Sequence, residues 1–316
     1  MNTGRLVAGA ALHPVDTLAL QFDAGSLQAL NIALAIIMFG VALELRPGDF
    51  VRLAKDPKAP LIGMACQFLI LPALACPLAL WLAPTPSMAL GMMLVAACPG
   101  GNVSNWLTQF ARGRVEVSVG MTAISTLAAV VTTPFNLAFW GSRNAETAAL
   151  LQDFSLSPSD MAGTVALLLV VPVALGMSVR QWLPKVAKRL KPIMTVLSLV
   201  FFVALIGLAF SANLDAFVAV IGDVFLPVAV LNALGLTLGY GAGRLLGLPE
   251  ADRRALSIEV GIQNSGLGLV LIFGFFGGLG GMAVVAGWWG IWHLIAGLSV
   301  AMFWRRNPPN ALQSAA

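Results

Sequence analysis

The chain has 316 residues, of which 59% are hydrophobic and only 10% are charged, and its mean hydropathy is +0.89. Soluble globular domains carry about 25% charged residues, so this composition excludes a soluble enzyme or a soluble binding module. Runs of about 20 apolar residues recur, which predicts an all-α integral membrane protein, because a helix satisfies its own main-chain polar groups inside lipid. The formal net charge of +4 does not indicate a nucleic-acid partner, since the basic residues lie between the apolar runs.

Residues 1–26 form an N-terminal segment that we do not expect to cross the membrane. Its apolar stretch is short, and His13, Pro14 and Asp16 interrupt it. One early Arg before this stretch gives only a weak resemblance to a signal peptide. We therefore expect the segment to lie outside the membrane or to be re-entrant.

Nine predicted membrane spans organise the rest of the chain. We place them at residues 27–45, 60–82, 87–110, 115–140, 161–183, 192–212, 217–243, 256–279 and 281–304. On this assignment residues 27–140 form a first repeat and residues 161–304 form a second repeat. Residues 305–316 are then a cytosolic tail.

The distribution of basic residues supports this number of spans. Of the 18 Lys and Arg residues, all but Arg5 and Arg143 fall in five regions that nine spans place on one side, at 46–60, 112–114, 180–191, 244–254 and after residue 304. Cytoplasmic connections are enriched in Lys and Arg. We therefore expect a multi-pass protein of a bacterial inner membrane, with its N-terminus outside and its C-terminus in the cytoplasm.

Two of the predicted spans contain residues that interrupt a helix inside the membrane. The span 87–110 contains CPGGNVSN at 98–105, and SIEVGIQNSG at 257–266 opens the span 256–279. An odd number of steps separates these spans, so they cross the membrane in opposite directions. Interrupted helices at matching places in two halves indicate an inverted-repeat transporter with its site near the midplane. The span 161–183 then has no counterpart, as if the first repeat lacks its opening helix.

The polar residues of the second interrupted span indicate a cation site. A carboxylate in lipid is costly, about 2.5–3.5 kcal/mol on insertion scales for the related Asp, so Glu259 needs a partner or water. A site of one carboxylate, hydroxyls, amides and carbonyls suits a hard cation, and a single fixed negative charge favours sodium over calcium. The N-terminal ends of the half-helices favour an anion. The alternative is that Glu259 lies near the cytosolic end of its span and reaches the lipid headgroups.

Five segments of the sequence, in order, resemble the bile acid:sodium symporter family. They are IIMFGVALEL at 36–45, CPGGNVSN at 98–105, FARGRVEVSV at 110–119, IEVGIQNSG at 258–266 and WHLIAG at 292–297. The resemblance extends from about Ile32 to Trp304. It implies a core domain with two crossing discontinuous helices and a panel domain against which the core moves. It also implies sodium-coupled symport of an organic anion by alternating access.

The resemblance further implies two sodium sites that share Glu259. For the first site it implies Ser104, Asn105, Ser118, Thr122 and Glu259. For the second site it implies Gln67, Glu259, Gln263 and the main-chain carbonyls of Val260 and Ile262. Ser118 and Thr122 lie one helical turn apart and therefore share a helix face. Hydroxyls bonded back to the preceding turn, and a Gln that only joins two helices, are the structural alternatives for Ser118, Thr122 and Gln67.

For the substrate, the resemblance implies contacts to Asn102, Asn264 and His293. An anion of bile-acid type, or a small carboxylate, would lie between the two half-helix N-termini near Asn102 and Asn264. Asn102 stands where the family has Thr, and Leu294 stands where bacterial relatives that bind bile acids have Asn. These departures leave the substrate open. His293 is as compatible with a buried core histidine as with a place in a cavity.

Other functions compete with symport. Cys98 directly before Pro99 is compatible with an arsenite-type efflux carrier, and Glu259 could carry the proton of a sodium/proton exchanger. A non-transporting, sodium-gated sensor or scaffold subunit is a further alternative. The spans contain no Ser/His or Asp/Asp pairing, so we do not expect an enzyme. The partners we expect are the organic anion, two sodium ions and membrane lipid, with no nucleic acid and no obligate protein partner.

Overall fold

The computed structural model describes residues 24–43, 55–101, 103–155, 157–194 and 214–308, with a few single positions between these ranges. Within this part of the chain the regular secondary structure is helical, apart from one isolated β-bridge between Gly100 and Gln263. Most of the N-terminal segment 1–26, most of the predicted span 192–212 and residues 309–316 of the predicted tail lie outside the described residues. The all-α architecture is therefore confirmed for the described residues.

The helices follow the predicted spans in order. The first half of the described chain forms α1 (Ala24–Ala42), α3 (Lys58–Ala65), η1 (Cys66–Ile70), α4 (Leu71–Leu82), α5 (Pro86–Ala97), α6 (Val103–Phe110), α7 (Val115–Gly141) and α8 (Ala145–Asp153). The second half forms α9 (Pro158–Val165), η2 (Ala166–Val170), α10 (Val171–Trp182), a helical stretch over 184–194, α12 (Leu214–Leu245), α13 (Glu250–Gly261), α14 (Ser265–Phe275) and α15 (Gly280–Arg306). The η segments are π-helical and continue α3 into α4 and α9 into α10.

Among the described residues, five continuous helices are long and apolar enough to cross a membrane. They are Lys58–Leu82, Val115–Gly141, Pro158–Trp182, Val220–Leu245 and Gly280–Arg306. Three shorter apolar helices, Leu27–Ala42, Pro86–Ala97 and Ser265–Phe275, fall within further predicted spans. The last two are short because each is one half of an interrupted span. The chain is thus an all-helical protein with several membrane-spanning helices, and the number nine stays a prediction.

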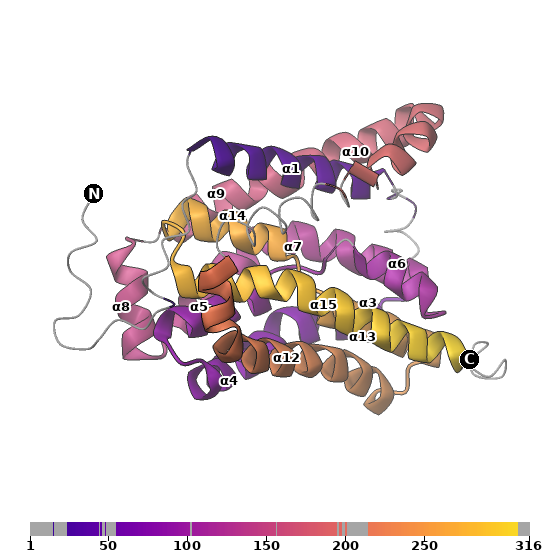
Figure 1. Ribbon diagram of the computed structural model, residues 1–316. Helices are drawn as coiled ribbons and strands as arrows, with labels where there is room; N and C mark the ends of the chain where they lie inside the picture. The colour runs from indigo at the N-terminus through magenta and orange to yellow at the C-terminus, as the bar shows by residue number, and fades with distance from the viewer. Residues whose placement is uncertain are drawn as a thin grey trace.

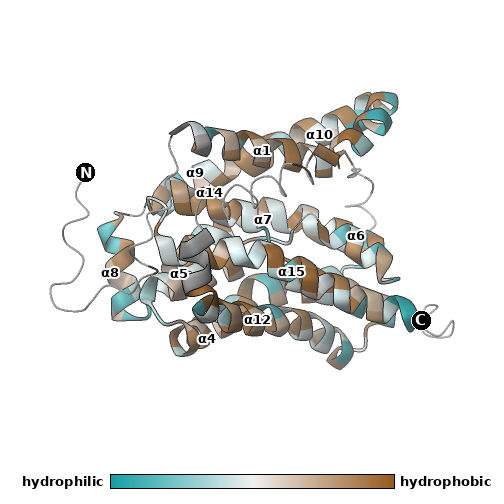
Figure 2. Cartoon of the chain, viewed as in Figure 1, coloured by the Kyte–Doolittle hydropathy of each residue, from teal (hydrophilic) through white to brown (hydrophobic). Residues whose placement is uncertain are grey.

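The surface chemistry agrees with a membrane environment. Figure 2 shows apolar residues along most of each helix, with hydrophilic residues gathered around α8 at one end and around the C-terminal ends of α12 and α15 at the other. Large apolar side chains such as Trp81, Leu69 and Val131 are exposed on the outside of the protein. Exposed apolar surface of this extent is rare in water-soluble monomers and is expected against lipid.

Helix α5 lies at the centre of the fold. Each of its residues from Ser87 to Ala97 is buried, as expected for a helix that is apolar on all sides. It packs against α4, α7 and α15. Figure 1 shows α5, α7, α14 and α15 in the middle of the molecule, with α1 and α10 along one edge and α4 and α12 along the opposite edge.

Prolines explain the two π-helical segments. Pro72 lies two residues after the end of η1, and Pro172 lies two residues after the end of η2. Proline lacks an N–H group, and its ring clashes with the carbonyl four residues earlier, so the helix widens locally. The N–H of Leu71 accordingly donates to the carbonyl of Cys66, five residues back. The carbonyl of Phe68 loses the partner that a non-proline residue at position 72 would have provided.

Candidate functional site

The two interrupted spans meet at their breaks. The first break separates α5 from α6, and the second separates α13 from α14. The main-chain N–H of Gly101 donates to the carbonyl of Ile262 at 2.6 Å, and the N–H of Asn264 donates to the carbonyl of Pro99 at 2.9 Å. The Ile262 carbonyl, one of the oxygens expected in the second sodium site, is thus engaged by the first break.

Two glycines allow the breaks to approach this closely. Gly100 forms the antiparallel bridge with Gln263. A Cβ at Gly100 would collide with Oε1 of Glu259, and a Cβ at Gly101 would lie 2.9 Å from the carbonyl oxygen of Gln263. Both contacts are too short for an ordinary side chain, so the break in the first span requires residues without a Cβ.

Glu259 lies at this junction, in the last turn of α13, and only 1% of it is exposed. Oγ of Ser118 donates to Oε2 of Glu259 at 2.8 Å, and Oγ1 of Thr122 donates to Oε1 at 2.6 Å. Both hydroxyls project from one face of α7, in agreement with their spacing in the sequence. No Lys or Arg of the described chain forms an ion pair with this carboxylate.

Around Glu259, oxygen atoms outnumber the protons available to join them. The single hydroxyl proton of Thr122 faces three acceptors: Oε1 of Glu259, Oδ1 of Asn105 at 3.2 Å and the carbonyl of Ser118 at 3.0 Å. The hydroxyl of Ser118 likewise lies 2.9 Å from Oδ1 of Asn105 and 2.8 Å from Glu259. A hydroxyl donates only one hydrogen bond, so some of these oxygens face each other without a proton between them. Such a set of oxygens suits a hard cation.

Two hydroxyls of α6 border the same cluster. Oγ of Ser104 lies 3.5 Å from Oγ1 of Thr122, and Oγ1 of Thr108 donates to Oγ of Ser118 at 3.3 Å. Ser104 and Asn105 were expected here from the sequence, whereas Thr108 was missed. Its position one turn after Ser104 on the same helix face is the signal that could have identified it.

The amides of Gln67 and Gln263 form a second polar group at the breaks. Nε2 of Gln67 donates to Oε1 of Gln263 at 2.6 Å and to the carbonyl of Cys98 at 2.9 Å. Nε2 of Gln263 donates to the carbonyl of Val260 at 2.8 Å. Both amides are buried, and Oε1 of Gln67 has no hydrogen-bond partner among the described residues. The structure therefore brings Gln67, Gln263 and Val260 together.

The π-helical turn that carries Gln67 is supported by α7. Nδ2 of Asn136 donates at 3.1 Å to the carbonyl of Phe68, the group that Pro72 leaves without a helical donor. Nε1 of Trp140 in turn donates to Oδ1 of Asn136 at 3.2 Å. Sequence reasoning missed Asn136, although Pro72 predicts a released carbonyl four residues before it.

Thr133 gives similar support to the first break. Its hydroxyl donates at 2.8 Å to the carbonyl of Ala97, the last residue of α5, and the side chain is fully buried. Helix ends leave carbonyls without helical partners, so this hydrogen bond satisfies a group that the break exposes. Helix α7 thus supplies the hydroxyls around Glu259 and also the donors that hold the surrounding main chain.

The structure describes two of the three residues expected to contact the substrate. Asn102 lies outside the described residues. Asn264 is buried and accepts the N–H of Leu267 at 3.0 Å, so it caps the N-terminus of α14. His293 is 4% exposed and stands edge-on to Trp289, with their ring centroids 6.3 Å apart. Its Nδ1 has no hydrogen-bond partner in the described part of the chain.

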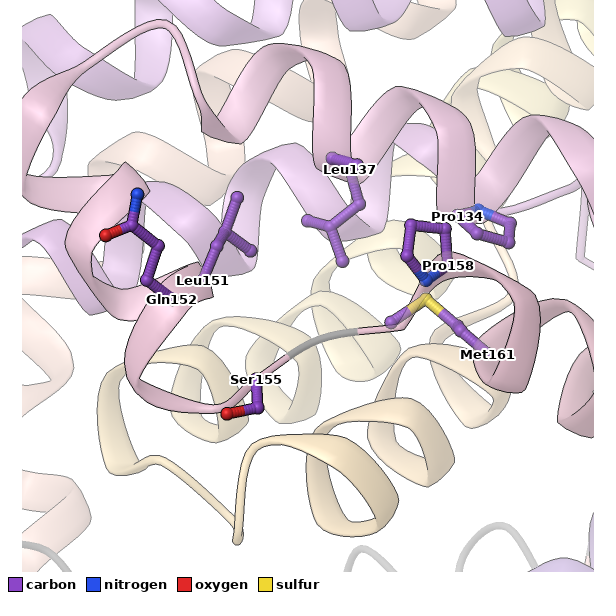
Figure 3. A pocket seen from close by; sticks show the side chains of 8 residues that line it. Pro134, Leu137, Leu151, Gln152, Ser155, Pro158 and Met161 are labelled. Atoms are coloured by element: carbon purple, nitrogen blue, oxygen red, sulfur yellow. The ribbon is translucent and has the colours of Figure 1, made fainter.

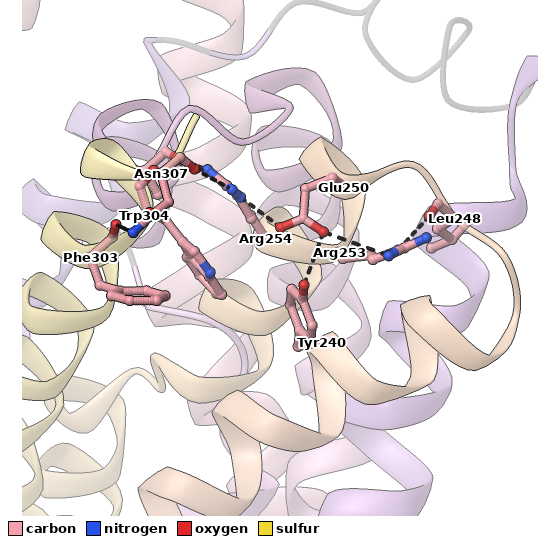
Figure 4. Close-up of polar contacts among 9 residues, drawn as sticks. Tyr240, Leu248, Glu250, Arg253, Arg254, Phe303, Trp304 and Asn307 are labelled. Atoms are coloured by element: carbon pink, nitrogen blue, oxygen red, sulfur yellow. Dashed lines mark hydrogen bonds and ion pairs between the residues drawn. The ribbon is translucent and has the colours of Figure 1, made fainter. Parts of the chain in front are cut away.

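The N-terminal end of α13 is held by a buried arginine, as Figure 4 shows. Nε of Arg254 donates to Oε1 of Glu250 at 2.9 Å. Its Nη1 donates to the carbonyls of Ala111 and Trp304, each at 3.0 Å, and its Nη2 donates to the carbonyl of Asn307 at 2.7 Å. One guanidinium therefore joins α13 to the chain just after α6 and to the end of α15.

A separate pocket of about 250 Å³ lies between the end of α7, α8 and the start of α9 (Figure 3). Its lining is mostly apolar and consists of Pro134, Leu137, Ala138, Leu151, Gln152, Ser155, Pro158 and Met161. None of the residues expected to bind sodium or the substrate lines this pocket. The polar cluster at the breaks is therefore the stronger candidate for the functional site.

Comparison with known proteins agrees with the cation site that the geometry indicates. The family model described as "Sodium Bile acid symporter family" matches residues 31–220. The chain is 31% identical over 278 residues to YocS, an uncharacterized sodium-dependent transporter of Bacillus subtilis (strain 168), with 88% of this chain and 83% of that protein covered.

Two relatives from eukaryotes extend the comparison. The chain is 33% identical to the chloroplastic protein "Probable sodium/metabolite cotransporter BASS1" of Arabidopsis thaliana, with 89% of this chain and 68% of that protein covered. It is 32% identical to the ileal sodium/bile acid cotransporter of Homo sapiens, with 75% of this chain and 67% of that protein covered. The names of these relatives describe sodium-dependent transport and no enzyme activity.

Proposed function

The chain belongs to the sodium bile acid symporter family, and we propose that it is a secondary active symporter that couples the entry of sodium to the uptake of an organic anion. Its relatives are transporters and cotransporters by name, so the chain is a member of a sodium-dependent transporter family and not of an enzyme family. Two further points belong to the proposal: the class of substrate and the mechanism of alternating access.

The observation that carries the proposal is the environment of Glu259. A buried carboxylate is held by the neutral hydroxyls of Ser118 and Thr122, where the breaks of two helices meet, and more oxygens than protons surround it. Hydroxyl donors stabilise a buried charge but do not neutralise it. A small cation from solution provides the missing charge and takes oxygen ligands of these types.

The proposal places two sodium ions in this arrangement, with Glu259 between them. The first ion would be bound by Ser104, Asn105, Ser118, Thr122 and Glu259. The second ion would be bound by Gln67, Glu259, Gln263 and the carbonyls of Val260 and Ile262. Binding of the second ion requires the hydrogen bonds of Gln67 and Gln263 to be exchanged for contacts to the cation.

The anion would bind beside the sodium ions, close to Asn102 and Asn264, with its carboxylate or sulfate near the N-termini of α6 and α14. Free N–H groups at helix N-termini favour negative charge. Sodium bound first would order the breaks and raise the affinity for the anion, and the anion would raise the affinity for sodium by the same factor. Two sodium ions with one monovalent anion move one net charge, which is worth about 2.3 kcal/mol per 100 mV, or roughly 50-fold accumulation.

Transport would proceed by movement of a core domain against a panel domain in a nine-span protein with the N-terminus outside. The core would contain both interrupted helices, whereas α1 and α10, which pack on each other along one edge of the molecule, would belong to the panel (Figure 1). The repeats over residues 27–140 and 161–304 would be inverted relative to each other, as in other transporters with paired broken helices. A bacterial inner membrane is the expected location.

Thermal unfolding of the purified protein in sodium and in potassium at equal ionic strength tests the sodium step. Sodium at 100 times its dissociation constant stabilises the folded state by about 2.7 kcal/mol, whereas potassium should not. Uptake of radiolabelled taurocholate and of a set of small carboxylates into sodium-free vesicles, with either sodium or potassium outside, then tests symport. A melting temperature that is equal in the two salts would contradict the proposal.

The same preparations separate the competing functions. Sodium/proton exchange predicts a pH change in vesicles when sodium is added without any anion. An arsenite carrier predicts export that is lost in Cys98→Ser and unchanged in Glu259→Ala. A sensor or scaffold predicts sodium-dependent stabilisation without movement of any solute.

A further inference from the structure

Asn232 is a buried polar residue in the middle of α12 that none of the sites above includes. It is 0% exposed, and its Nδ2 donates at 2.8 Å to the carbonyl of Gly261, the last residue of α13. This donor fixes the orientation of the amide, because the nitrogen must face the carbonyl. Oδ1 of Asn232 then points elsewhere and has no hydrogen-bond partner among the described residues.

The hydrogen bond to Gly261 explains the buried Nδ2 group of Asn232 but not its buried Oδ1. Gly261 precedes the break, so its carbonyl lacks a regular helical donor and Nδ2 replaces that donor. A carbonyl oxygen that is buried without a partner costs about 1–3 kcal/mol. A donor from a serine or threonine would satisfy Gly261 without this cost. The unpartnered oxygen therefore calls for a second role.

The hydrogen bond to Gly261 places Asn232 next to the stretch of α13 that contributes to the second proposed sodium site. Helices α12 and α13 run side by side in opposite directions, and Oγ of Ser257 donates to the carbonyl of Leu236 at 2.6 Å one turn further from the break. Helix α12 also packs against η1, the turn that carries Gln67. Asn232 and Gln67 thus donate hydrogen bonds to neighbouring positions of the second break. Asn232 donates to Gly261, and Gln67 donates to Gln263.

These two amides share an unusual feature. Oε1 of Gln67 and Oδ1 of Asn232 are the two side-chain amide oxygens of this region that are fully buried and unpartnered in the described structure, and each amide uses its nitrogen as a donor to the breaks. Neutral amide oxygens are good ligands for hard cations. We propose that Oδ1 of Asn232 is an additional ligand of the sodium ion at the Gln67 site, an inference that rests on the sodium symport proposed above.

This assignment gives α12 a part in the cation site. The second ion would then be held by three elements: the π-helical turn, the end of α13 and the middle of α12. Sodium binding there would stiffen the contact between α12 and α13 at the level of the breaks. A role as a sodium ligand would also explain why position 232 is an Asn, although a smaller hydroxyl residue would suffice to cap α13.

The test measures the sodium concentration at half-maximal thermal stabilisation, with potassium keeping the ionic strength constant. Removing even an outer partner of a metal site lowers metal affinity by about 10- to 100-fold, so Asn232→Leu should raise this midpoint by about tenfold or more. It should also reduce the steepness of the sodium dependence, as Gln67→Leu should, because one of the two proposed ions is lost. The double variant, Gln67→Leu with Asn232→Leu, should then have a sodium midpoint no higher than that of either single variant.

Thr133→Val is the matched control. It removes a buried donor from the carbonyl of Ala97 at the other break, as Asn232→Leu removes one from Gly261, but Thr133 offers no unpartnered oxygen. It should lower the melting temperature in every salt and leave the sodium midpoint unchanged within about twofold. Asn232→Asp serves as the second variant, since it keeps an oxygen for the cation and should retain the steepness that Asn232→Leu loses.

The outcomes separate this inference from the function on which it rests. If wild type responds to sodium and Asn232→Leu behaves like Thr133→Val, Asn232 only caps α13 and the inference is wrong, while sodium binding stands. If Asn232→Asp loses the sodium response as completely as Asn232→Leu, the oxygen is not a ligand. If wild type shows no sodium-specific stabilisation, the proposed function and the inference are both wrong.

Discussion

Two of the three buried carboxylates of helix α13, Glu250 and Glu259, are held in opposite ways. Glu250, at the first turn, is 8% exposed and contacts Nε of Arg254 at 2.9 Å and the hydroxyl of Tyr240 at 2.9 Å. Nη1 of Arg253 lies 3.6 Å from its second oxygen. Glu259, in the last turn, is 1% exposed, and its hydrogen bonds in the described structure come from hydroxyl groups.

Under the proposed function, this difference assigns Glu250 to structure and Glu259 to cation binding. Burying an ion costs several kcal/mol, and a guanidinium in good geometry offsets much of that cost with its own charge. Glu250 therefore has a permanent counter-ion within the protein. The described residues give Glu259 no permanent counter-ion, so under the proposed function its charge is available to a cation that binds and leaves. A transporter needs a counter-ion that can leave at its binding site, and a permanent counter-ion where a buried carboxylate only holds helices together.

The largest expected effect comes from Glu259→Gln. The substitution keeps the size of the side chain and removes its charge, so both proposed sodium ions lose their shared ligand. We expect the sodium-specific rise in melting temperature and sodium-driven uptake to be abolished. Thermal unfolding in sodium and potassium, and uptake into vesicles, measure the two effects.

Glu250→Gln provides the comparison for that result. It should lower the melting temperature in both salts, because Arg254 loses its carboxylate partner, and leave the increment due to sodium intact. Equal loss of the sodium increment in both variants would mean that the two carboxylates do not differ in the way their partners suggest.

Arg254, which anchors the N-terminal end of α13, is expected to give the next largest effect when it is replaced, and this effect is on stability alone. Arg254→Met keeps the aliphatic stem but removes the guanidinium, which leaves Glu250 and the carbonyls of Ala111, Trp304 and Asn307 without this donor. Breaking a buried ion pair from one side costs about 3–5 kcal/mol, and the free energy of unfolding should fall by that amount.

The sodium midpoint of Arg254→Met separates anchoring from binding. We expect the midpoint to stay within about twofold of wild type in protein that remains folded at low temperature. A tenfold rise of the midpoint would show that the anchor positions the cation ligands, contrary to the separation proposed here.

Local signals in the sequence predicted the parts of this comparison that depend on chemistry along one helix. Pro and Gly at 98–105 and the polar run at 257–266 predicted two interruptions, and α5 and α13 end there. The spacing of Ser118 and Thr122 predicted a shared helix face, and both hydroxyls reach Glu259. In each case one segment contains both the signal and its consequence.

Contacts between distant segments were harder to predict. That Gln67 meets Gln263 was expected only from the family resemblance, because periodicity alone does not say which helices pack together. Thr133, Asn136 and Asn232 were missed, since a buried Asn or Thr in an apolar helix gives no indication of the carbonyl it will meet. The anchor was missed for the same reason, as Arg254 was counted only as a loop charge.

The smallest expected effect is that of a single hydroxyl beside Glu259. Thr122→Val keeps the shape of the side chain and removes the oxygen that lies 2.6 Å from Oε1 of Glu259. If this oxygen is one of several sodium ligands, its loss should weaken sodium binding by about tenfold, or about 1.4 kcal/mol, without abolishing it. The midpoint of sodium-dependent stabilisation measures the change.

Ser125→Ala is the control on the same helix. Ser125 is also buried, but its hydroxyl donates at 3.1 Å to the carbonyl of Thr122 and contacts no oxygen of Glu259. Removing this hydroxyl should leave the sodium midpoint unchanged, because the carbonyl of Thr122 remains within the main-chain hydrogen bonding of α7. A shift as large as that of Thr122→Val would attribute the effect to the stability of α7 and not to a ligand. A shift in Thr122→Val alone would show that the hydroxyls around Glu259 bind the ion that its charge attracts.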